Sequence, residues 1–492
     1  MHDLIIIGGG PAGSSAALAA AKAGLYVLLL EKESFPRYKP CGGALSNRSF
    51  SVLDFRLPEE LCERAITGAR VHFHNKMIEG HSRDPLFSLV TRSKFDKFLL
   101  QKANDAGCNT VTMRAEGYLE KEDHVEVITK RKKFKSRFLV DASGCQSRLR
   151  YCIQDGANKS QYGISVVTEI EDDDAKIQER LHNSLDFYFD VGSTGYGWIF
   201  PHKGYYSVGI WGQASNLNSL RTNMQNFLAR VGFRGRYRLH GHKIPLGGIN
   251  RRIARGRIIL AGDSAGFADP ITGEGIYYAL RSGQIAARAI LEQDPSDVSK
   301  IYEEMCKKDF GQDLENALHL LHSLNGSREM CLSALVERDD IMNNYIDVMA
   351  AKKTYKAFAD WILPIIIHIY IDNFNKRANK IPKFIKVLLG RERINFKMIH
   401  NDGSVRRTGL YFEKDRIAKV IEGGLKNPTI VMAATQDAII RIQRSNNPIA
   451  AMKRERQNGG VSIKAKSIGA EIKLNAVLSA AGVVRLLNHN FF

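Results

Sequence analysis

The glycines near the N-terminus have the types and spacing of a phosphate-binding turn. Gly8, Gly10 and Gly13 follow an apolar run at residues 2–7, and a second apolar run ends at Glu31. In a strand–turn–helix unit the first glycine makes the turn, the second lets the backbone approach a pyrophosphate, and the third lets the helix pack on the strand. The positive end of the helix then faces the phosphates, and Glu31 is placed to accept hydrogen bonds from ribose hydroxyls. The sequence therefore predicts a site for an ADP moiety, which both FAD and NAD contain.

Two segments far along the chain favour FAD. An apolar run at 258–261 ends in Gly262 and Asp263, and the segment Thr272-Gly273-Glu274-Gly275 precedes a helix expected to run to about residue 291. Asp263 can hold ribityl hydroxyls. The N-terminus of that helix can place its positive end against the N1/C2=O edge of a flavin, where the reduced form carries negative charge. We therefore expect a site that favours the reduced, hydride-donating flavin.

Three other segments are expected to complete the cofactor site. The loop at 34–46 contains two prolines and two adjacent glycines, and its Cys41 is interpreted as a reactive thiol, a small packed residue or a side chain that shapes the flavin face. Arg92, between a strand and a helix, can clamp a phosphate or a ribityl oxygen. Another strand ends in a turn at 141–144, beside the first glycine turn. The residues expected to bind FAD are Gly8, Gly10, Ala12, Gly13, Glu31, Lys32, Cys41, Gly42, Gly43, Arg92, Asp141, Gly144, Gly262, Asp263, Thr272, Gly273 and Gly275.

A second domain is indicated by strand-like alternation that begins at about Ile164. This alternation predicts an antiparallel sheet. Within it, residues 195–201 interleave Tyr196, Trp198 and Phe200 with glycines. These aromatic side chains are either ordinary core or, in a sheet that faces a cofactor, an apolar and water-excluding wall suited to a lipid-like substrate.

Six motifs together carry a resemblance: GGGPAG at 8–13, FPRYKPCGG at 35–43, Arg92 with Phe95-Asp96, DASG at 141–144, GYGWIFP at 195–201, and GDSAG through DPITGEG at 262–275. This combination resembles the geranylgeranyl reductase family, whose flavoproteins share the fold of para-hydroxybenzoate hydroxylase. The resemblance covers about residues 1–395. It implies non-covalently bound FAD and saturation of isoprenoid C=C bonds. The substrate is a digeranylgeranylglycerol phospholipid in archaeal members, which we expect here, and a chlorophyll or its geranylgeranyl diphosphate precursor in phototrophs.

Carried over to this chain, the resemblance implies that residues 41–43 flank the flavin. It also implies that Tyr196 and Trp198 line a prenyl tunnel. We expect Cys41, Tyr196 and Trp198 to be the catalytic residues. Ser193-Thr194 stands where the family often has a proline before the tyrosine, a departure that bears on the shape of the tunnel.

The expected reaction transfers a hydride from flavin N5 to one carbon of an isolated prenyl double bond while a proton is added to the other. An unactivated alkene develops carbocation character on protonation, so the site must be dry and apolar with one acid in reach. The candidate proton donors are the Cys41 thiol, a tyrosine or an ordered water. The chain shows no second ADP-binding motif, so an external donor, NAD(P)H or ferredoxin, is expected to supply electrons.

Two other functions remain open at this point. A flavin monooxygenase would use the same FAD motifs, and a lipid-binding or carrier protein could keep a non-catalytic flavin site. A flavin halogenase is disfavoured because the segment at 195–201 has one tryptophan where a WxWxIP-type segment has two.

The charge of the chain predicts an anionic partner. The 71 Lys and Arg residues against 52 Asp and Glu give a net charge of +19. We expect an anionic membrane surface and no nucleic acid, because the basic residues are dispersed and no recognition module is visible. The apolar window at 361–371 is too short to span a bilayer, so it is either a buried helix or a segment in the membrane interface. The basic residues at 376–386 suit the interfacial helix. Seven scattered cysteines favour a reducing compartment, and no metal site is expected. The predicted location is cytoplasmic and peripheral to the membrane, with no cleavable signal region.

The predicted fold class is α/β. We expect a Rossmann-like FAD-binding domain formed by 1–160 and 250–300, an antiparallel substrate domain at 161–249, and a helical segment at 301–398. Residues 401–492, with 15 Lys and Arg against 7 Asp and Glu, are expected to form a small α/β domain. Its predicted order of strand, helix, helix and strand between 428 and 464 weakly resembles the sterol carrier protein type 2 fold, which holds lipids in an apolar tunnel. A packing extension is the alternative.

Overall fold

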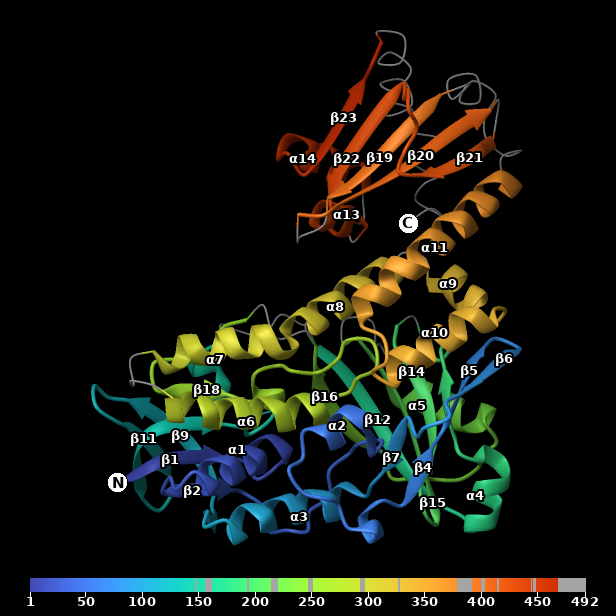
Figure 1. Ribbon diagram of the computed structural model, residues 1–492. Coiled ribbons are helices and arrows are strands. Elements are labelled where there is room, and N and C mark those ends of the chain that lie inside the picture. The colour runs from blue at the N-terminus through green and yellow to red at the C-terminus, as the bar shows by residue number, and fades with distance from the viewer. Residues whose placement is uncertain are drawn as a thin grey trace. The chain divides into compact units, whose positions relative to one another are not determined.

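The computed structural model divides the chain into two compact units, which are described separately. Unit 1 comprises Met1–Leu321 and Leu332–Phe358, and unit 2 comprises His322–Cys331 and the described residues from Ala359 onward. The structure describes residues 1–146, 148–154, 162–192, 194–213, 220–246, 251–292, 297–325, 328–377, 392–399, 403–413, 416–443, 445 and 448–467. The mixed α/β class predicted from the sequence is confirmed in both units (Figure 1).

The first sheet of unit 1 is a mainly parallel sheet in the order β17-β18-β11-β1-β2-β8, extended by β9 and β10. Its central strand, β1, is apolar because it is buried on both faces, and Leu4, Ile5 and Ile6 are fully buried. Ile5 pairs with Leu28 on β2 and with Leu139 on β11. The strands are β1 (His2–Ile7), β2 (Val27–Glu31), β8 (Asn109–Thr112), β9 (Ala115–Glu120), β10 (Val125–Thr129), β11 (Lys133–Asp141), β17 (Ala254–Arg255) and β18 (Ile258–Leu260).

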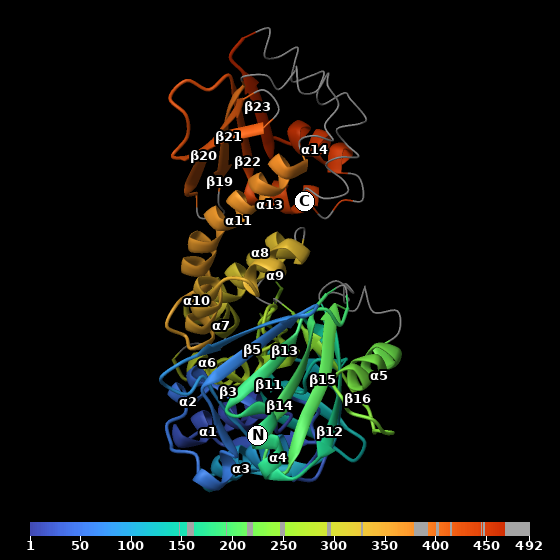
Figure 2. The same ribbon diagram turned by 90° about the vertical axis from the view of Figure 1, so that its right-hand side faces the viewer.

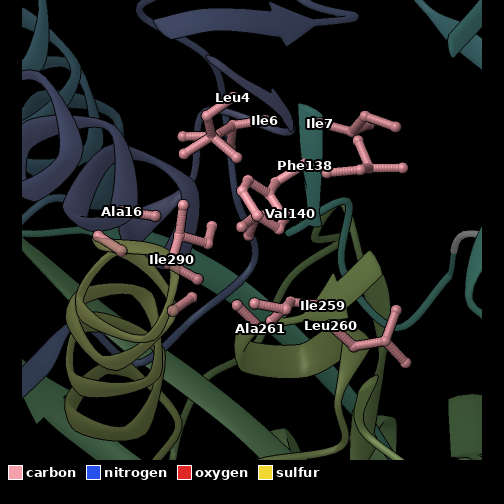
Figure 3. Close-up of a cluster of buried hydrophobic side chains, with 14 of the residues drawn as sticks. Leu4, Ile6, Ile7, Ala16, Phe138, Val140, Ile259, Leu260, Ala261 and Ile290 are labelled. Carbon is pink, nitrogen blue, oxygen red and sulfur yellow. The ribbon is translucent and has the colours of Figure 1, made fainter. Parts of the chain in front are cut away.

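Helices α1 (Pro11–Lys22) and α6 (Ile276–Glu292) pack against each other and against this sheet. Small residues allow the close approach, because a Cβ on Gly283 of α6 would lie 2.2 Å from the carbonyl oxygen of Ala12. The cluster in Figure 3 joins Ala16 of α1 and Ile290 of α6 to apolar side chains of β1, β11 and β18. This core fixes the N-terminal end of α1 relative to the ends of the strands. Helix α3 (Arg92–Asp105) also contacts α1.

The second sheet has the order β16-β12-β15-β14-β13-β5-β6 and is antiparallel except for the parallel pair β13 and β5 (Figure 2). Helices α4 (Asp174–Leu181) and α5 (Leu220–Arg230) share an apolar cluster with β12, β14 and β15. The strands are β5 (Gly68–Phe73), β6 (Lys76–His81), β12 (Tyr162–Glu171), β13 (Ser184–Tyr188), β14 (Tyr196–Pro201), β15 (Tyr205–Gln213) and β16 (His240–Pro245).

The boundaries of this sheet differ from the expected substrate domain at 161–249. Strands β5 and β6 come from residues before 161 and join the sheet through β13. Local alternation could not reveal this, because the parallel pairing joins strands more than 100 residues apart. A small third sheet is made by β3 (Ala44–Ser46), β4 (Arg64–Ile66) and β7 (Phe87–Leu89), and the short helix α2 spans Asn47–Ser51.

The expected helical segment at 301–398 is helical only in part. Strand β19 begins at Arg393, and residues up to Leu321 and from Leu332 to Phe358 belong to unit 1. No helix in the described ranges is long and apolar enough to cross a membrane. Most of the basic stretch at 376–386 lies outside the described residues. The helices are α7 (Val298–Cys306), α8 (Gln312–Asn325), α9 (Arg328–Leu335), α10 (Asp339–Met349) and α11 (Tyr355–Arg377).

Unit 2 contains a five-stranded sheet in the order β21-β20-β19-β22-β23 (Figure 1). The core packs Ala438 of α13 and Ala451 of α14 against Ile430 and Ile463 of the sheet. The order predicted for 428–464 is confirmed, because β22, α13, α14 and β23 follow one another there. The elements are β19 (Arg393–Ile399), β20 (Val405–Glu413), β21 (Arg416–Glu422), β22 (Ile430–Thr435), α13 (Gln436–Gln443), α14 (Pro448–Gln457) and β23 (Val461–Ala465).

Candidate active site

Unit 1 contains a cavity of about 1090 Å³ between the carboxyl ends of the first sheet and one face of the second sheet. This is where open α/β sheets bind their ligands. Most of the residues singled out from the sequence line it: Gly8, Gly10, Ala12, Glu31, Lys32, Cys41, Gly42, Gly43, Arg92, Gly144, Tyr196, Trp198, Asp263, Thr272, Gly273 and Gly275. Gly13, Asp141 and Gly262 are not among the lining residues, so any influence they have on a ligand passes through the turns they hold.

We call the part of the cavity lined by the turns after β1, β2, β11 and β18 the nucleotide wall. In its first turn, Gly8 has φ +101°, and a Cβ there would lie 2.5 Å from the carbonyl oxygen of Ala142. A Cβ on Gly13 would lie 1.8 Å from the carbonyl oxygen of Gly8. Gly10 differs, because the nearest atom to its Cβ position is Nη2 of Arg37 at 3.5 Å. Gly8 and Gly13 are therefore required by packing, whereas Gly10 leaves open space at the helix N-terminus.

Glu31 ends β2 as a buried carboxylate with a fixed orientation. Its Oε2 accepts a 2.7 Å hydrogen bond from the Gly9 N–H, and its Oε1 accepts one of 3.0 Å from the Glu33 N–H. These bonds tie the end of β2 to the glycine turn. Lys32, the next residue, is exposed at the edge of the cavity.

Asp141 lies behind the nucleotide wall and stabilises two of its turns. Its fully buried carboxylate accepts hydrogen bonds from the Ser143 N–H at 3.0 Å and from the Ser264 hydroxyl at 3.4 Å. The Ser264 hydroxyl also accepts a 2.8 Å bond from the Gly144 N–H. Burial raises the pKa of Asp141. Asp141 does not line the cavity, and its side chain joins the turn after β11 to the turn after β18.

Arg92 presents a cation to the cavity. Its guanidinium is held by Asp96 through two hydrogen bonds of 2.8 and 2.9 Å, and Arg37 contacts the same carboxylate at 3.2 Å. Burial alone would lower the pKa of Arg92, but the charge of Asp96 outweighs it and the pKa is raised. Two guanidinium groups share one carboxylate, so this corner of the cavity keeps a net positive charge suited to an anionic ligand.

Opposite lies the apolar wall, which we define as the cavity-lining aromatic and aliphatic side chains of the second sheet, of β7 and of α10. Tyr196, Trp198 and Phe200 alternate with other buried residues along β14 and are each less than a tenth exposed. The ring of Tyr196 meets that of Trp211 edge-on at 5.5 Å. The wall is made by Phe87, Val167, Leu185, Phe187, Tyr196, Trp198, Phe200, Trp211, Ile244, Tyr345, Val348 and Met349.

The loop at 41–43 lies directly against this wall. A Cβ on Gly42 would lie 2.7 Å from the ring of Phe200, so glycine lets the loop approach it. The His202 ring contacts the carbonyl oxygen of Gly42 at 3.0 Å through Nε2 and the Glu63 carboxylate at 2.7 Å through Nδ1. The Cys41 thiol accepts a 3.4 Å hydrogen bond from the Gly43 N–H and lines the cavity. Cys41 thus lies where the two walls meet.

Comparisons with known proteins agree with this geometry. The family model described as "FAD binding domain" matches residues 1–292. A geranylgeranyl diphosphate reductase of Rhodobacter capsulatus is 31% identical over 301 residues, which cover 59% of this chain and 75% of that protein. The chain belongs to the geranylgeranyl reductase family. It is an FAD-dependent oxidoreductase that acts on carbon–carbon double bonds.

Two further relatives bear on the fold and the range of functions in the family. A digeranylgeranylglycerophospholipid reductase of Methanothermobacter thermautotrophicus is 28% identical over 363 residues, covering 68% of this reductase and 91% of that protein. The crystal structure of a geranylgeranyl bacteriochlorophyll reductase-like protein from Thermoplasma acidophilum is 24% identical, with a TM-score of 0.64, and covers 74% of this chain and 98% of that one. The predicted para-hydroxybenzoate hydroxylase-like fold is thereby confirmed.

The residues of the reductase fit FAD. The space left at Gly10, the open N-terminus of α1 and the paired guanidinium groups suit a pyrophosphate, and the fixed Glu31 carboxylate suits a ribose. Asp263 and the turn at 272–275 line the cavity further along.

Sequence reasoning missed the side chains that hold the turn at 272–275. Asp269 is fully buried, and its Oδ1 accepts hydrogen bonds from the Ile271 and Thr272 N–H groups at 2.7 and 2.9 Å. Its Oδ2 accepts a 2.7 Å bond from the Tyr355 hydroxyl, which comes from the start of α11. The motif DPITGEG contained Asp269, but no sequence signal linked Tyr355 to it.

Two more residues that sequence reasoning missed lie beside Asp263. The Lys39 ammonium lies 2.6 Å from Nε2 of His242 on β16, and that nitrogen lies 3.7 Å from Oδ2 of Asp263. Burial alone would raise the pKa of Asp263, but His242 and Lys39 outweigh it and the pKa is lowered. Lys39 lies in the loop motif at 35–43, so its position could have suggested a role, whereas nothing in the sequence marked His242. Ser193 lies outside the described residues.

Proposed function

We propose that this reductase saturates the C=C bonds of geranylgeranyl chains, and that its substrate is a digeranylgeranylglycerophospholipid of the archaeal type. The observation that carries the proposal is that one cavity has both a nucleotide wall and an apolar wall, with Cys41 and Gly42 between them. The similarity to the reductase of Methanothermobacter thermautotrophicus, which covers nearly all of that protein, supports the choice of lipid.

We propose that the seventeen residues named from the sequence act on FAD in two ways. Fourteen line the cavity and would contact the cofactor, while Gly13, Asp141 and Gly262 would keep the turns in shape. Bound FAD supplies the hydride. The helix end at 272–275, held by Asp269, would place positive backbone dipoles toward the cofactor and favour its reduced state.

The apolar wall supports the prenyl part of the proposal. Its side chains offer no charge to an alkene, and an apolar lining of this kind would keep water from the reacting carbons. Trp198 and Tyr196 would position the chain. The Tyr196 hydroxyl donates a hydrogen bond to the carbonyl oxygen of Thr272, and burial raises its pKa, so this phenol stays protonated but is a weak acid. Cys41, at the junction of the walls, and an ordered water remain the proposed proton donors.

We also propose that electrons come from an external donor, NAD(P)H or ferredoxin, and that the protein works at an anionic membrane surface on the cytoplasmic side. The net charge of +19 supports attraction to such a surface, and the lipid substrate would reside there. Unit 2 would serve as the lipid-binding part. Flotation of the protein with vesicles of anionic or neutral phospholipid measures this directly, and equal binding to both would contradict it.

The test of the substrate uses the reduced holoenzyme under anaerobic conditions. Three prenyl substrates are supplied in parallel: the digeranylgeranyl phospholipid, geranylgeranyl diphosphate, and a geranylgeranylated chlorophyll. Mass spectrometry is expected to show stepwise gains of two hydrogen atoms per bond, fastest with the phospholipid. Faster turnover of either other substrate would contradict the lipid assignment. Unchanged lipids in all three would contradict prenyl reduction, and a product that appears only with oxygen would indicate a monooxygenase.

A further inference from the structure

The Lys39, His242 and Asp263 side chains form a cluster in which the FAD motifs assign a role to Asp263 alone. They come from the loop after β2, from β16 of the second sheet and from the turn after β18, and all three line the cavity. The cluster therefore bridges the two sheets at the cofactor site. Within the described part of the chain, the hydrogen-bond partner of the Lys39 ammonium is His242.

The hydrogen bonding of His242 can take two arrangements. Its Nε2 accepts a hydrogen bond if Lys39 is an ammonium, but it must carry a proton to form an ion pair with Asp263, whose Oδ2 lies 3.7 Å away. One nitrogen cannot do both. The other ring nitrogen lies 3.4 Å from the amide nitrogen of Gln146. The cluster can thus bind a variable number of protons while its three side chains keep their positions.

The surroundings of Lys39 and His242 favour loss of a proton from this pair as long as no further negative charge enters the cavity. Burial lowers the pKa of Lys39. The charge of Asp263 opposes this lowering, and the charge of Arg92 adds to it. Cys41 and Cys145 also face Lys39. Burial likewise lowers the pKa of His242, with the same opposition from Asp263 and the same addition from Arg92 and Lys39. A new negative charge in the cavity would shift both pKa values upward.

We propose that the Lys39, His242 and Asp263 cluster takes up one proton from solvent when the bound FAD is reduced. Two electrons and one proton convert the oxidised flavin to its anionic reduced form, and a second proton binds to Lys39 or His242. The electrons come from a two-electron donor such as a dihydronicotinamide, or from dithionite in the test. The cluster then balances the charge of the reduced cofactor in a cavity of low dielectric constant. Lys39 and His242 thus act as proton acceptors in the reduced state.

The experiment measures the midpoint potential of the FAD-loaded protein from about pH 6 to about pH 9, a range that spans ordinary histidine and depressed lysine pKa values. Each proton taken up per two electrons changes the potential by about 30 mV for every tenfold change in proton concentration. We therefore expect a slope of about 60 mV per pH unit for the natural chain. The variants Lys39→Met and His242→Gln are expected to show about half that slope.

Lys243→Met is the matched control. Lys243 follows His242 on β16, is exposed and does not line the cavity, so the variant removes the same charge next to the cluster. It is expected to keep the full slope. If Lys39→Met does not retain flavin, His242→Gln, which keeps a hydrogen-bonding side chain of similar size, supplies the comparison.

Two further readouts separate the cluster from the flavin itself. The absorption spectrum of the reduced protein is expected to be that of the anionic flavin at every pH. With a dihydronicotinamide as the donor, whose hydride brings the proton of the flavin, a pH-indicator dye is expected to report one proton taken up from solvent per flavin. A neutral reduced flavin, a natural chain that takes up no proton from solvent, or a full slope in both cluster variants would overturn the proposal. These measurements need no prenyl substrate, so their outcome is independent of the proposed substrate.

Discussion

The nucleotide wall and the apolar wall differ in which atoms define their shape. Backbone turns form the first, where Gly8 and Gly13 leave no room for a side chain. Large side chains from separate strands form the second, where Tyr196 and Trp211 touch ring to ring. The difference suggests that a change in the first wall acts on folding and cofactor binding, whereas a change in the second alters which substrate fits.

The largest expected effect distinguishes two glycines of the first wall. Gly13→Ala places a Cβ 1.8 Å from a backbone oxygen, so we expect a loss of at least about 3 kcal/mol in unfolding free energy and little retained flavin. Gly10→Ala has an allowed φ of −73° and no atom closer than 3.5 Å. It should fold normally and bind FAD at least about tenfold more weakly, because it obstructs the phosphate. Urea unfolding measures the stability of each variant, and flavin absorbance measures how much FAD it binds. Equal stability of the two variants would contradict this distinction.

A substitution on α10, in the apolar wall, should affect prenyl reduction and leave FAD binding unchanged. Val348 of α10 lines the cavity, so Val348→Trp fills space there. We expect prenyl reduction to fall at least about tenfold while flavin content and reduction by dithionite are unchanged, because one apolar side chain changes only the room for the chain. Val348→Ile, which adds one carbon, is the control. Loss of flavin from Val348→Trp would show that the two walls are not separable.

Tyr355 tests the hydrogen bonds behind the turn at 272–275. Tyr355→Phe leaves Oδ2 of the buried Asp269 without its donor, which costs about 1–3 kcal/mol in unfolding free energy. Tyr345→Phe removes a hydroxyl from the same cavity but not from Asp269, and it should cost less. Denaturant unfolding of the two variants decides this, and equal losses would contradict the role given to Asp269.

The smallest expected effect is the pH dependence of the Glu63 and His202 pair behind the loop at 41–43. Burial alone would raise the pKa of Glu63, but hydrogen bonds from His202 and Thr91 outweigh it and hold the pKa below its usual 4.5. The stabilisation is therefore present above pH 4.5 and is lost as the pH falls through the lower folded value. Glu63→Gln should lose about 1 kcal/mol near neutral pH and less in acid, whereas the exposed Glu60→Gln should change neither. A loss that is independent of pH would contradict the assignment.

The sequence predicted the nucleotide wall well because its chemistry depends on local spacing. Gly8 to Gly13 and Glu31 lie within one strand–turn–helix–strand unit, where spacing alone sets position. It could not predict that β5 and β6 join the second sheet, or that Tyr355 bonds Asp269, because such contacts depend on how distant segments pack. The position of His242 beside Asp263 could not be predicted either, because the two residues lie on segments that meet only in the folded chain.

The most direct test of the central claim is a single turnover by the reduced, FAD-loaded protein. The protein is mixed without oxygen with digeranylgeranyl phospholipid in vesicles, and the flavin absorbance and lipid mass are followed together. We expect one saturated double bond, a gain of two hydrogen atoms, for each flavin oxidised. Flavin that stays reduced beside unchanged lipid, or flavin oxidised without a gain in lipid mass, would contradict the claim that the two walls serve prenyl reduction.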